Sequence, residues 1–209
     1  MKRILPLILS TLLLTSCSGP DSSGGVDFSK TANVFPYGDC QGSGYQTHST
    51  KETGCGWITV DEKNYYIMPW AKLRYANLSG ADLKFANLDS AKLNSANLND
   101  ANLIDANLEF SNLYDAKLRD ANLRDAKLRA ASLLFANLRD ANLRDADLKF
   151  ADLSSADLRD ADLSGADLRH AILTNANLSG ANLSGVKANK FTTCPNGKKW
   201  GTSGNNCPF

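Results

Sequence analysis

The amino-acid sequence predicts an all-β solenoid, in which the backbone winds around a thin apolar core. The main observation is a five-residue period, because leucine occupies every fifth position from Leu73 to Leu183, 23 positions without an exception. Alanine stands two residues before each of these leucines, except where Ser111 replaces it. Internal repeats of this kind determine the fold before any local propensity does.

The five-residue period excludes both a long helix and a straight strand. On an α-helix, steps of five residues advance by about 500°, so the leucines would spread around the whole cylinder without forming an apolar stripe. On a straight strand, an odd step would place successive leucines on opposite faces. We therefore expect the chain to turn once per repeat, with Leu and Ala inside and the other three positions facing water.

The repeat resembles a known motif. The segment 121–125, with the sequence ANLRD, is similar to the A(N/D)LXX motif of the pentapeptide-repeat proteins, and this motif covers residues 71–185 without a break. The resemblance implies a right-handed quadrilateral parallel β-helix with four repeats, hence twenty residues, per coil. Arg-Asp doublets begin at positions 119, 139 and 159 and at 124 and 144, which agrees with that count.

The first sixteen residues, 1–16, predict an export signal. A basic start precedes the apolar stretch 4–14, which is shorter than the ~20 residues that a transmembrane helix needs. The stretch runs into the sequence LTSC at 14–17, which resembles the lipobox of bacterial lipoproteins and implies acylation of Cys17 after cleavage. An ordinary cleaved signal with a chance cysteine is the alternative. Acyl chains on Cys17 would anchor the protein to a membrane.

The residue after the lipobox bears on the location of the anchored protein. Ser18 resembles the outer-membrane sorting pattern of lipoproteins, where an Asp would retain the protein at the inner membrane. The resemblance therefore implies a cell-envelope protein, held at the outer membrane if the organism has two membranes.

The segments that flank the repeats are predicted to be a tether and two caps. Residues 17–33 are rich in Ser and Gly, which predicts a flexible tether. Residues 34–70 predict an N-terminal cap with a β-hairpin, whose strands 57–60 and 65–68 flank a turn at 61–64 and lie across the first coil. Residues 186–209 predict a C-terminal cap. Such caps cover the open strand edges and bare leucines at the ends of a stack.

Four cysteines besides Cys17 lie outside the repeats, at Cys40, Cys55, Cys194 and Cys207. An even set in an exported chain predicts two disulfides, for which three connectivities exist. Because the solenoid separates the two pairs, we expect the bonds Cys40–Cys55 and Cys194–Cys207, each closing one cap. A zinc site is the alternative, and the lack of Cys-x-x-Cys spacing disfavours it.

Charged residues are predicted to align in rows along the solenoid. At a period of twenty residues, arginines stack on arginines and the following aspartates on aspartates, so each row of like charge lies beside a row of opposite charge. We interpret these rows first as a structural device and second as a candidate binding surface. The residues concerned are Arg119, Asp120, Arg139, Asp140, Arg159 and Asp160.

Aromatic residues are also predicted to align. Phe110 and Phe150 lie forty residues apart on one face, with Ala130 between them, and Tyr75 and Phe135 share another face. We interpret both pairs as corner packing, with an apolar binding strip as the alternative.

The sequence contains no recognisable catalytic, cofactor or metal site. His170 is the only histidine within the repeats, and no serine or cysteine nucleophile with a recognisable elbow surrounds it. Glycine-rich phosphate loops are also absent, and no Asp-x-Asp loop of the kind that holds calcium appears. The formal net charge of +1 differs from the strongly basic charge of nucleic-acid binders, so we expect no nucleic-acid partner.

Three functions remain open on this evidence. The first is a non-enzymatic lipoprotein whose rigid shaft binds or scaffolds an envelope protein or a cell-wall component. The second comes from the resemblance, because some pentapeptide-repeat proteins mimic DNA and bind type II topoisomerases; the export signal and the nearly neutral repeats disfavour it. The third is an enzyme with a site beside the first coil, where Tyr45, His48, Glu52 and Trp57 would gather.

Overall fold

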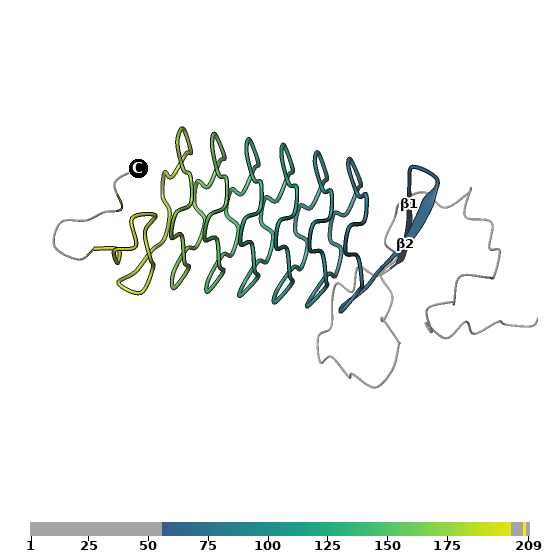
Figure 1. The fold of residues 1–209 in the computed structure, drawn as a ribbon, viewed down its shortest axis with the longest axis horizontal. Helices are drawn as coiled ribbons and strands as arrows, with labels where there is room; N and C mark the ends of the chain where they lie inside the picture. The colour runs from purple at the N-terminus through teal and green to yellow at the C-terminus, as the bar shows by residue number, and fades with distance from the viewer. Residues whose placement is uncertain (1–55, 202–206, 208–209) are drawn as a thin grey trace, which may run out of the picture.

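The computed structural model describes residues 56–201 and Cys207, which form a short hairpin followed by a stack of coils (Figure 1). The hairpin consists of β1 (Gly56–Val60) and β2 (Lys63–Ile67), which pair antiparallel. This confirms the predicted hairpin. The predicted turn at 61–64 was too long, because Asp61 and Glu62 alone form the connection, both with positive φ. A two-residue turn of this kind matches the twist of a hairpin. It was not predicted because its sequence, Asp61-Glu62, is not the Asn-Gly or Asp-Gly that usually marks such turns.

The hairpin lies against the first coil of the stack (Figure 1). Ile58 and Ile67 are buried and belong to the same apolar core as the repeats. The Asn77 backbone N–H donates to the Tyr65 hydroxyl at 3.2 Å, and the Asn77 side-chain amide donates to the Asp61 carboxylate at 2.6 Å. The predicted position of the hairpin is therefore confirmed, and its turn and the middle of β2 are hydrogen-bonded to the solenoid.

Each coil contains four repeats. From Lys72–Lys92 to Asp167–Lys187, parallel bridges join one residue of every repeat to the residue twenty positions later. The hydrogen bonds alternate in direction: Leu123 N–H donates to the Asn142 carbonyl at 2.7 Å, and Asn142 N–H donates to the Ala121 carbonyl at 2.9 Å. This parallel ladder at a constant shift is a four-sided β-helix, as the sequence predicted.

A tight turn at each corner separates consecutive sides. The alanine that follows the turn donates its N–H to the preceding leucine carbonyl, as from Ala126 to Leu123 at 3.1 Å. The residue just before that alanine has a positive φ, such as 59° at Asp125, which is the third position of a type II turn. Tyr75 and Phe110 also adopt this conformation. The corner position therefore accepts aromatic as well as small polar side chains.

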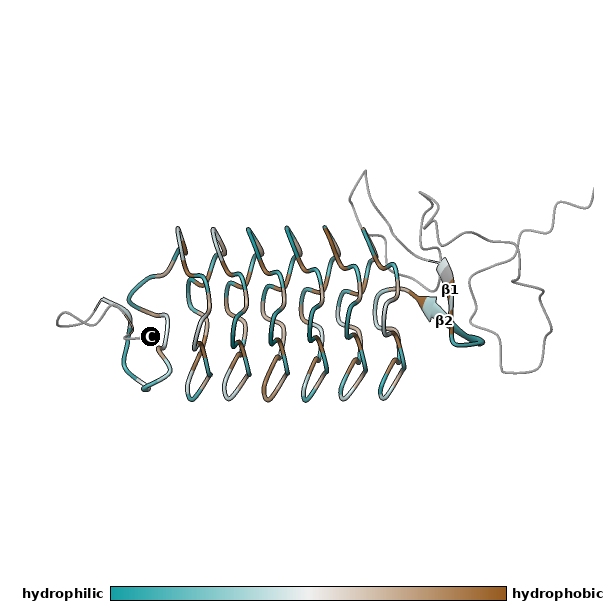
Figure 2. Ribbon diagram, turned by 90° about the horizontal axis from the view of Figure 1, so that it is seen from above, coloured by the Kyte–Doolittle hydropathy of each residue, from teal (hydrophilic) through white to brown (hydrophobic). Residues whose placement is uncertain are grey.

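The core consists of the leucines and alanines of the repeats. Leu123 is 0% exposed and Ala121 1%, and burial of each leucine contributes roughly 1.5–3 kcal/mol. Ser111 takes an alanine position without leaving its hydroxyl unpaired, because it donates to the Leu108 carbonyl at 2.7 Å. Apolar and polar residues alternate along every coil (Figure 2).

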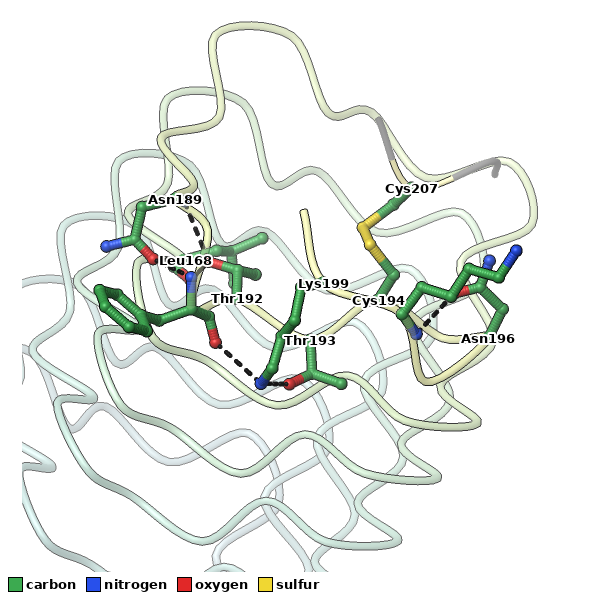
Figure 3. The surroundings of a disulfide bond; sticks show 10 residues. Leu168, Asn189, Thr192, Thr193, Cys194, Asn196, Lys199 and Cys207 are labelled. Carbon is green, nitrogen blue, oxygen red and sulfur yellow. Dashed lines mark hydrogen bonds between the residues drawn. A yellow bond between two sulfur atoms is a disulfide. The ribbon is translucent and has the colours of Figure 1, made fainter. Parts of the chain in front are cut away.

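The stack continues past residue 185 before the chain closes it. Lys187 and Thr193 still form parallel bridges, and Thr193 follows one extra residue, since it pairs with Ile172 at a separation of 21. Thr193 also pairs antiparallel with Lys199, which folds the tail back. The next residue, Cys194, is buried and forms a disulfide with Cys207, with a Cα–Cα distance of 5.3 Å (Figure 3).

The structure thus confirms the predicted C-terminal disulfide. The predicted Cys40–Cys55 bond, the tether and the acylated Cys17 lie outside the described residues. Within residues 56–201, no helix is long and apolar enough to span a bilayer.

Candidate binding surface

Two of the four edges of the solenoid carry the candidate binding residues. The charged edge comprises the three Arg-Asp doublets that begin at 119, 139 and 159. The aromatic edge comprises Trp70, Ser90, Phe110, Ala130, Phe150, His170 and Phe191. Backbone hydrogen bonds hold the aromatic edge in register, since Trp70 N–H donates to the Asp89 carbonyl and Ser90 N–H to the Glu109 carbonyl, both at 2.8 Å.

The charged edge is a network of ion pairs between neighbouring coils. Arg119 lies 3.2 Å from the carboxylate of Asp120 and 3.7 Å from that of Asp140 on the next coil. Arg139 repeats this arrangement, at 3.3 Å from Asp140 and 3.8 Å from Asp160. The predicted rows are therefore present, with Arg119 and Arg139 each between two aspartates.

The third arginine of the charged edge departs from this pattern. Arg159 donates two hydrogen bonds to Asp157, at 2.8 and 2.6 Å. Asp157 stands where the two preceding coils have Lys117 and Asn137, and the next coil has Gly180 where an aspartate would stand. These bonds hold the pKa of Asp157 below its usual value and raise the pKa of Arg159. Every charge of this edge thus has a partner within the chain, and such partly exposed pairs contribute little stability.

The C-terminal half of the aromatic edge is a continuous ring stack. The rings of Phe150 and His170 are 4.5 Å apart with an interplanar angle of 20°, and those of His170 and Phe191 are 4.8 Å apart at 12°. The guanidinium of Arg129 lies 5.6 Å from the Phe150 ring, and the Lys190 ammonium lies 5.1 Å from the Phe191 ring. Cations therefore flank the stack at both ends, in favourable positions over ring faces.

The N-terminal half of the aromatic edge is hollow. Trp70 and Phe110 are 61% and 57% exposed, and Ser90 lies between them. Together with the adjacent side of the solenoid they line a surface hollow of about 740 Å³. Burial raises the pKa of Asp89 in this hollow. The remaining lining residues are Arg74, Lys92, Asn94 and Asn112.

The sequence predicted part of the aromatic edge. Phe110 and Phe150 share it, with Ala130 between them as expected. Trp70 and Phe191 were missed because the repeat was taken to begin at residue 71 and end at residue 185. Two signals show that the repeats extend further. Met68 occupies a leucine position before residue 71, and one inserted residue precedes Phe191 after residue 185.

The second predicted aromatic pair lies on a different edge. Tyr75 is 71% exposed, and the ring of Phe135 packs edge-on against Tyr114, with centroids 5.7 Å apart. This contact agrees with corner packing for Phe135.

The structure describes only some of the residues on which the predicted absence of a catalytic or metal site depends. Among residues 56–201 and Cys207, no group of three or more His, Cys, Asp or Glu side chains is placed to hold a metal ion. Tyr45, His48 and Glu52 lie outside the described residues, and Trp57 lies in β1. The hypothesis of a site beside the first coil therefore stays untested.

A family model for pentapeptide repeats matches the chain in eight copies, over residues 70–100, 81–120, 121–160 and 151–187. Together these cover more than half of the sequence. A search of curated protein sequences finds no significant match.

Solved structures of pentapeptide repeat proteins are also similar to the chain. One from Nostoc PCC 7120 is 46% identical over 46% of this chain and 71% of its own, with a TM-score of 0.35. Rfr23 from the cyanobacterium Cyanothece 51142 is 38% identical over 48% of this chain, with a TM-score of 0.28. A protein from the Arabidopsis thaliana thylakoid lumen is 29% identical over 52% of this chain, with a TM-score of 0.34. The chain spans 61% and 65% of the last two proteins.

Proposed function

This chain belongs to the pentapeptide-repeat family, and we propose that it is a non-enzymatic, lipid-anchored envelope protein whose rigid shaft binds or scaffolds another envelope component. The family implies a right-handed quadrilateral β-helix and consists in general of non-catalytic binding proteins. The proposal adds the anchor, the location and the class of partner.

The observation that carries the proposal is that the inward side chains of the coil are uniform, whereas the outward side chains differ from edge to edge. Inward positions are uniform, as Leu123 and Ala121 are both buried. Outward positions differ from edge to edge and form straight rows of similar side chains, such as the stacked rings of Phe150 and His170. A rigid rod with distinct edges is suited to binding along its surface.

The anchor and the location are supported by the sequence alone. The apolar stretch 4–14 and the sequence LTSC at 14–17 motivate export and acylation of Cys17. In this proposal the membrane is reached through the acyl chains, and the partner is an envelope protein or a cell-wall component.

The topoisomerase-binding alternative finds no specific support in the charged edge. A protein that imitates DNA presents a strongly negative surface, whereas here Arg119 and Arg139 neutralise the aspartates beside them. We therefore keep it as the competing outcome of the experiment below.

Site-specific photo-cross-linking in intact cells tests the proposal. A photoreactive phenylalanine analogue replaces Phe110 on the aromatic edge. In the control protein it replaces Phe85, which is also exposed but lies on another edge. Mass spectrometry of the envelope fraction then identifies what is attached. We expect a product from position 110 that is absent from position 85 and is lost in the Cys17→Ala variant. Unprocessed protein in the cytosol, cross-linked to a topoisomerase, would contradict the proposal.

A further inference from the structure

The aromatic edge lacks one ring at Ser90. In the C-terminal half, Phe150, His170 and Phe191 stack at 4.5 and 4.8 Å, so one coil advances by about the thickness of one stacked ring. Trp70 and Phe110 lie two coils apart, about 9.6 Å, with only the small Ser90 side chain between them. The step between these two exposed residues therefore has room for one ring supplied by a ligand, in the position that His170 occupies further along the edge.

Uncompensated positive charge lies beside this step. Lys72 and Lys92 are direct neighbours in the parallel ladder, where like charges repel each other. Arg74 belongs to the same side of the solenoid and contacts the Tyr75 ring at 5.6 Å. No ion pair of these three cations occurs within residues 56–201 and Cys207. This contrasts with the charged edge, and it favours an anionic ligand.

The remaining lining groups favour a sugar over an aromatic ligand. Asp89, Asn94 and Asn112 line the hollow with carboxyl and amide groups, which hydrogen-bond hydroxyl groups in either direction. Asp89 already accepts from the Ser90 hydroxyl at 3.3 Å and Asn112 from the Tyr114 backbone N–H at 3.0 Å. A flat aromatic ring would offer no hydrogen bond to the other donors and acceptors of this group. The faces of a sugar ring carry C–H groups, which the negative faces of Trp70 and Phe110 attract. The volume of about 740 Å³ also exceeds that of a single ring and accommodates neighbouring units of a chain.

We propose that the hollow between Trp70 and Phe110 binds an acidic sugar of an envelope polysaccharide. The sugar ring lies at the Ser90 step between the two aromatic side chains, its acidic group pairs with Lys92 and Arg74, and its hydroxyls bond to Asp89 and Asn94. The source of the ligand rests on the envelope location proposed above, whereas binding itself is a property of the hollow and can be tested in solution.

Calorimetry on the full-length protein in detergent tests this inference. The probe is an oligogalacturonate, a short chain of acidic sugars, compared with a neutral galactan of the same length, with poly-glutamate and with AMP. We expect oligogalacturonate to bind at least tenfold more tightly than the other three. Phe110→Ala should weaken oligogalacturonate binding at least tenfold, and Lys92→Gln should weaken it by a similar factor while leaving the galactan unaffected.

Two matched variants provide the controls. Phe85→Ala removes an exposed ring that also lies at a positive-φ corner beside a lysine, and Lys117→Gln removes a bridge-position lysine from another side. Both should bind oligogalacturonate like the parent, and thermal melts of all variants confirm that they fold.

Several outcomes would overturn the inference. Equal binding of poly-glutamate would mean that charge alone acts, and preference for AMP would mean that the step takes an aromatic base. Equal losses in the control variants, or no oligogalacturonate binding up to millimolar concentration, would also refute it. Cross-linking at position 110 detects an envelope partner of any class, so a Cys17-dependent protein product there without oligogalacturonate binding would refute this inference and leave the proposed function standing.

Discussion

The charged edge and the aromatic edge are built on identical turns, yet they differ in how far the chain satisfies its own side chains. On the charged edge, Arg139 lies within 3.8 Å of carboxylates from its own coil and the next. On the aromatic edge, His170 is sandwiched between two rings, whereas Trp70 and Phe110 are more than half exposed, with Ser90 between them. The unsatisfied half of the aromatic edge is where we expect an external ligand.

The two edges differ because of single residues on a β-helical backbone that is the same in every coil. Because the residue at each corner meets its counterpart twenty positions later, one substitution opens or closes a step without disturbing the coil. Ser90 opens the aromatic edge in this way, and Asp157, in the row that holds Asn137 one coil earlier, gives Arg159 a partner on its own coil. The interior decides stability, and the edges decide specificity.

The largest effect is expected from a substitution in the leucine core, which supports both edges. Leu123→Asp places a carboxylate at a position that is 0% exposed, and an unpaired buried charge of this kind costs more than about 4 kcal/mol. We expect the middle coils to unfold, with loss of a cooperative urea transition followed by circular dichroism. Arg124→Ser, one residue away on the surface, should change the free energy of unfolding by less than about 0.5 kcal/mol. Equal midpoints for the two variants would refute the inward placement of leucine.

A smaller effect is expected from the ring stack. His170→Ala removes two stacked ring contacts, at 4.5 and 4.8 Å, and should cost about 1–3 kcal/mol of unfolding free energy, since aromatic pairs contribute roughly 0.5–1.5 kcal/mol each. Ser155→Ala is the matched control, because Ser155 has the same positive φ. A similar melting temperature for His170→Ala and Ser155→Ala would show that the aromatic edge contributes no stability of its own.

Acid should act on the charged edge through Asp157. The hydrogen bonds from Arg159 lower the pKa of Asp157, so the folded state favours the charged form. The resulting stability is present above the unfolded pKa of about 3.9 and is lost as the pH falls through the lower folded value. Asp157→Asn should therefore flatten the decline of the melting temperature below about pH 4.

Arg159→Gln removes the cause of the same shift and provides the control for this experiment. It should flatten the acid decline to a similar extent, and the double variant should add little. An unchanged decline in both variants would show that this pair does not link stability to pH.

The inward residues followed from the sequence, because Leu stands at every fifth position and Ser111 is the single exception to alanine. The coil length of twenty residues came from the resemblance to pentapeptide-repeat proteins, with which the spacing of the Arg-Asp doublets agrees. The limits of the stack were less predictable. Met68 replaces a leucine at one end, and an extra residue precedes Thr193 at the other, and only the backbone pairing shows that both still belong to the coil.

The candidate site was predictable only in its alignment. A spacing of twenty residues placed Phe110 and Phe150 on one edge, but the spacing alone does not show where that edge is hollow. The hollow depends on Trp70, which lies outside the regular repeats, and on cations whose pairing is decided by distances of a few ångströms. The partner of Arg159 likewise depends on a single residue, because Asp157 stands where Arg139 has Asn137.

The smallest expected effect concerns the ion pairs themselves. Arg139→Gln removes contacts of 3.3 and 3.8 Å between side chains that are 32–52% exposed, and pairs of this kind contribute about 0.2–1 kcal/mol. We expect a loss near the lower limit that disappears in 1 M salt, where the Debye length is only about 3 Å. The comparison with His170→Ala is then decisive, because ring stacking does not depend on ionic strength. If salt reduced the effect of His170→Ala as strongly as that of Arg139→Gln, the two edges would not differ in the way described above, and both would act through charge.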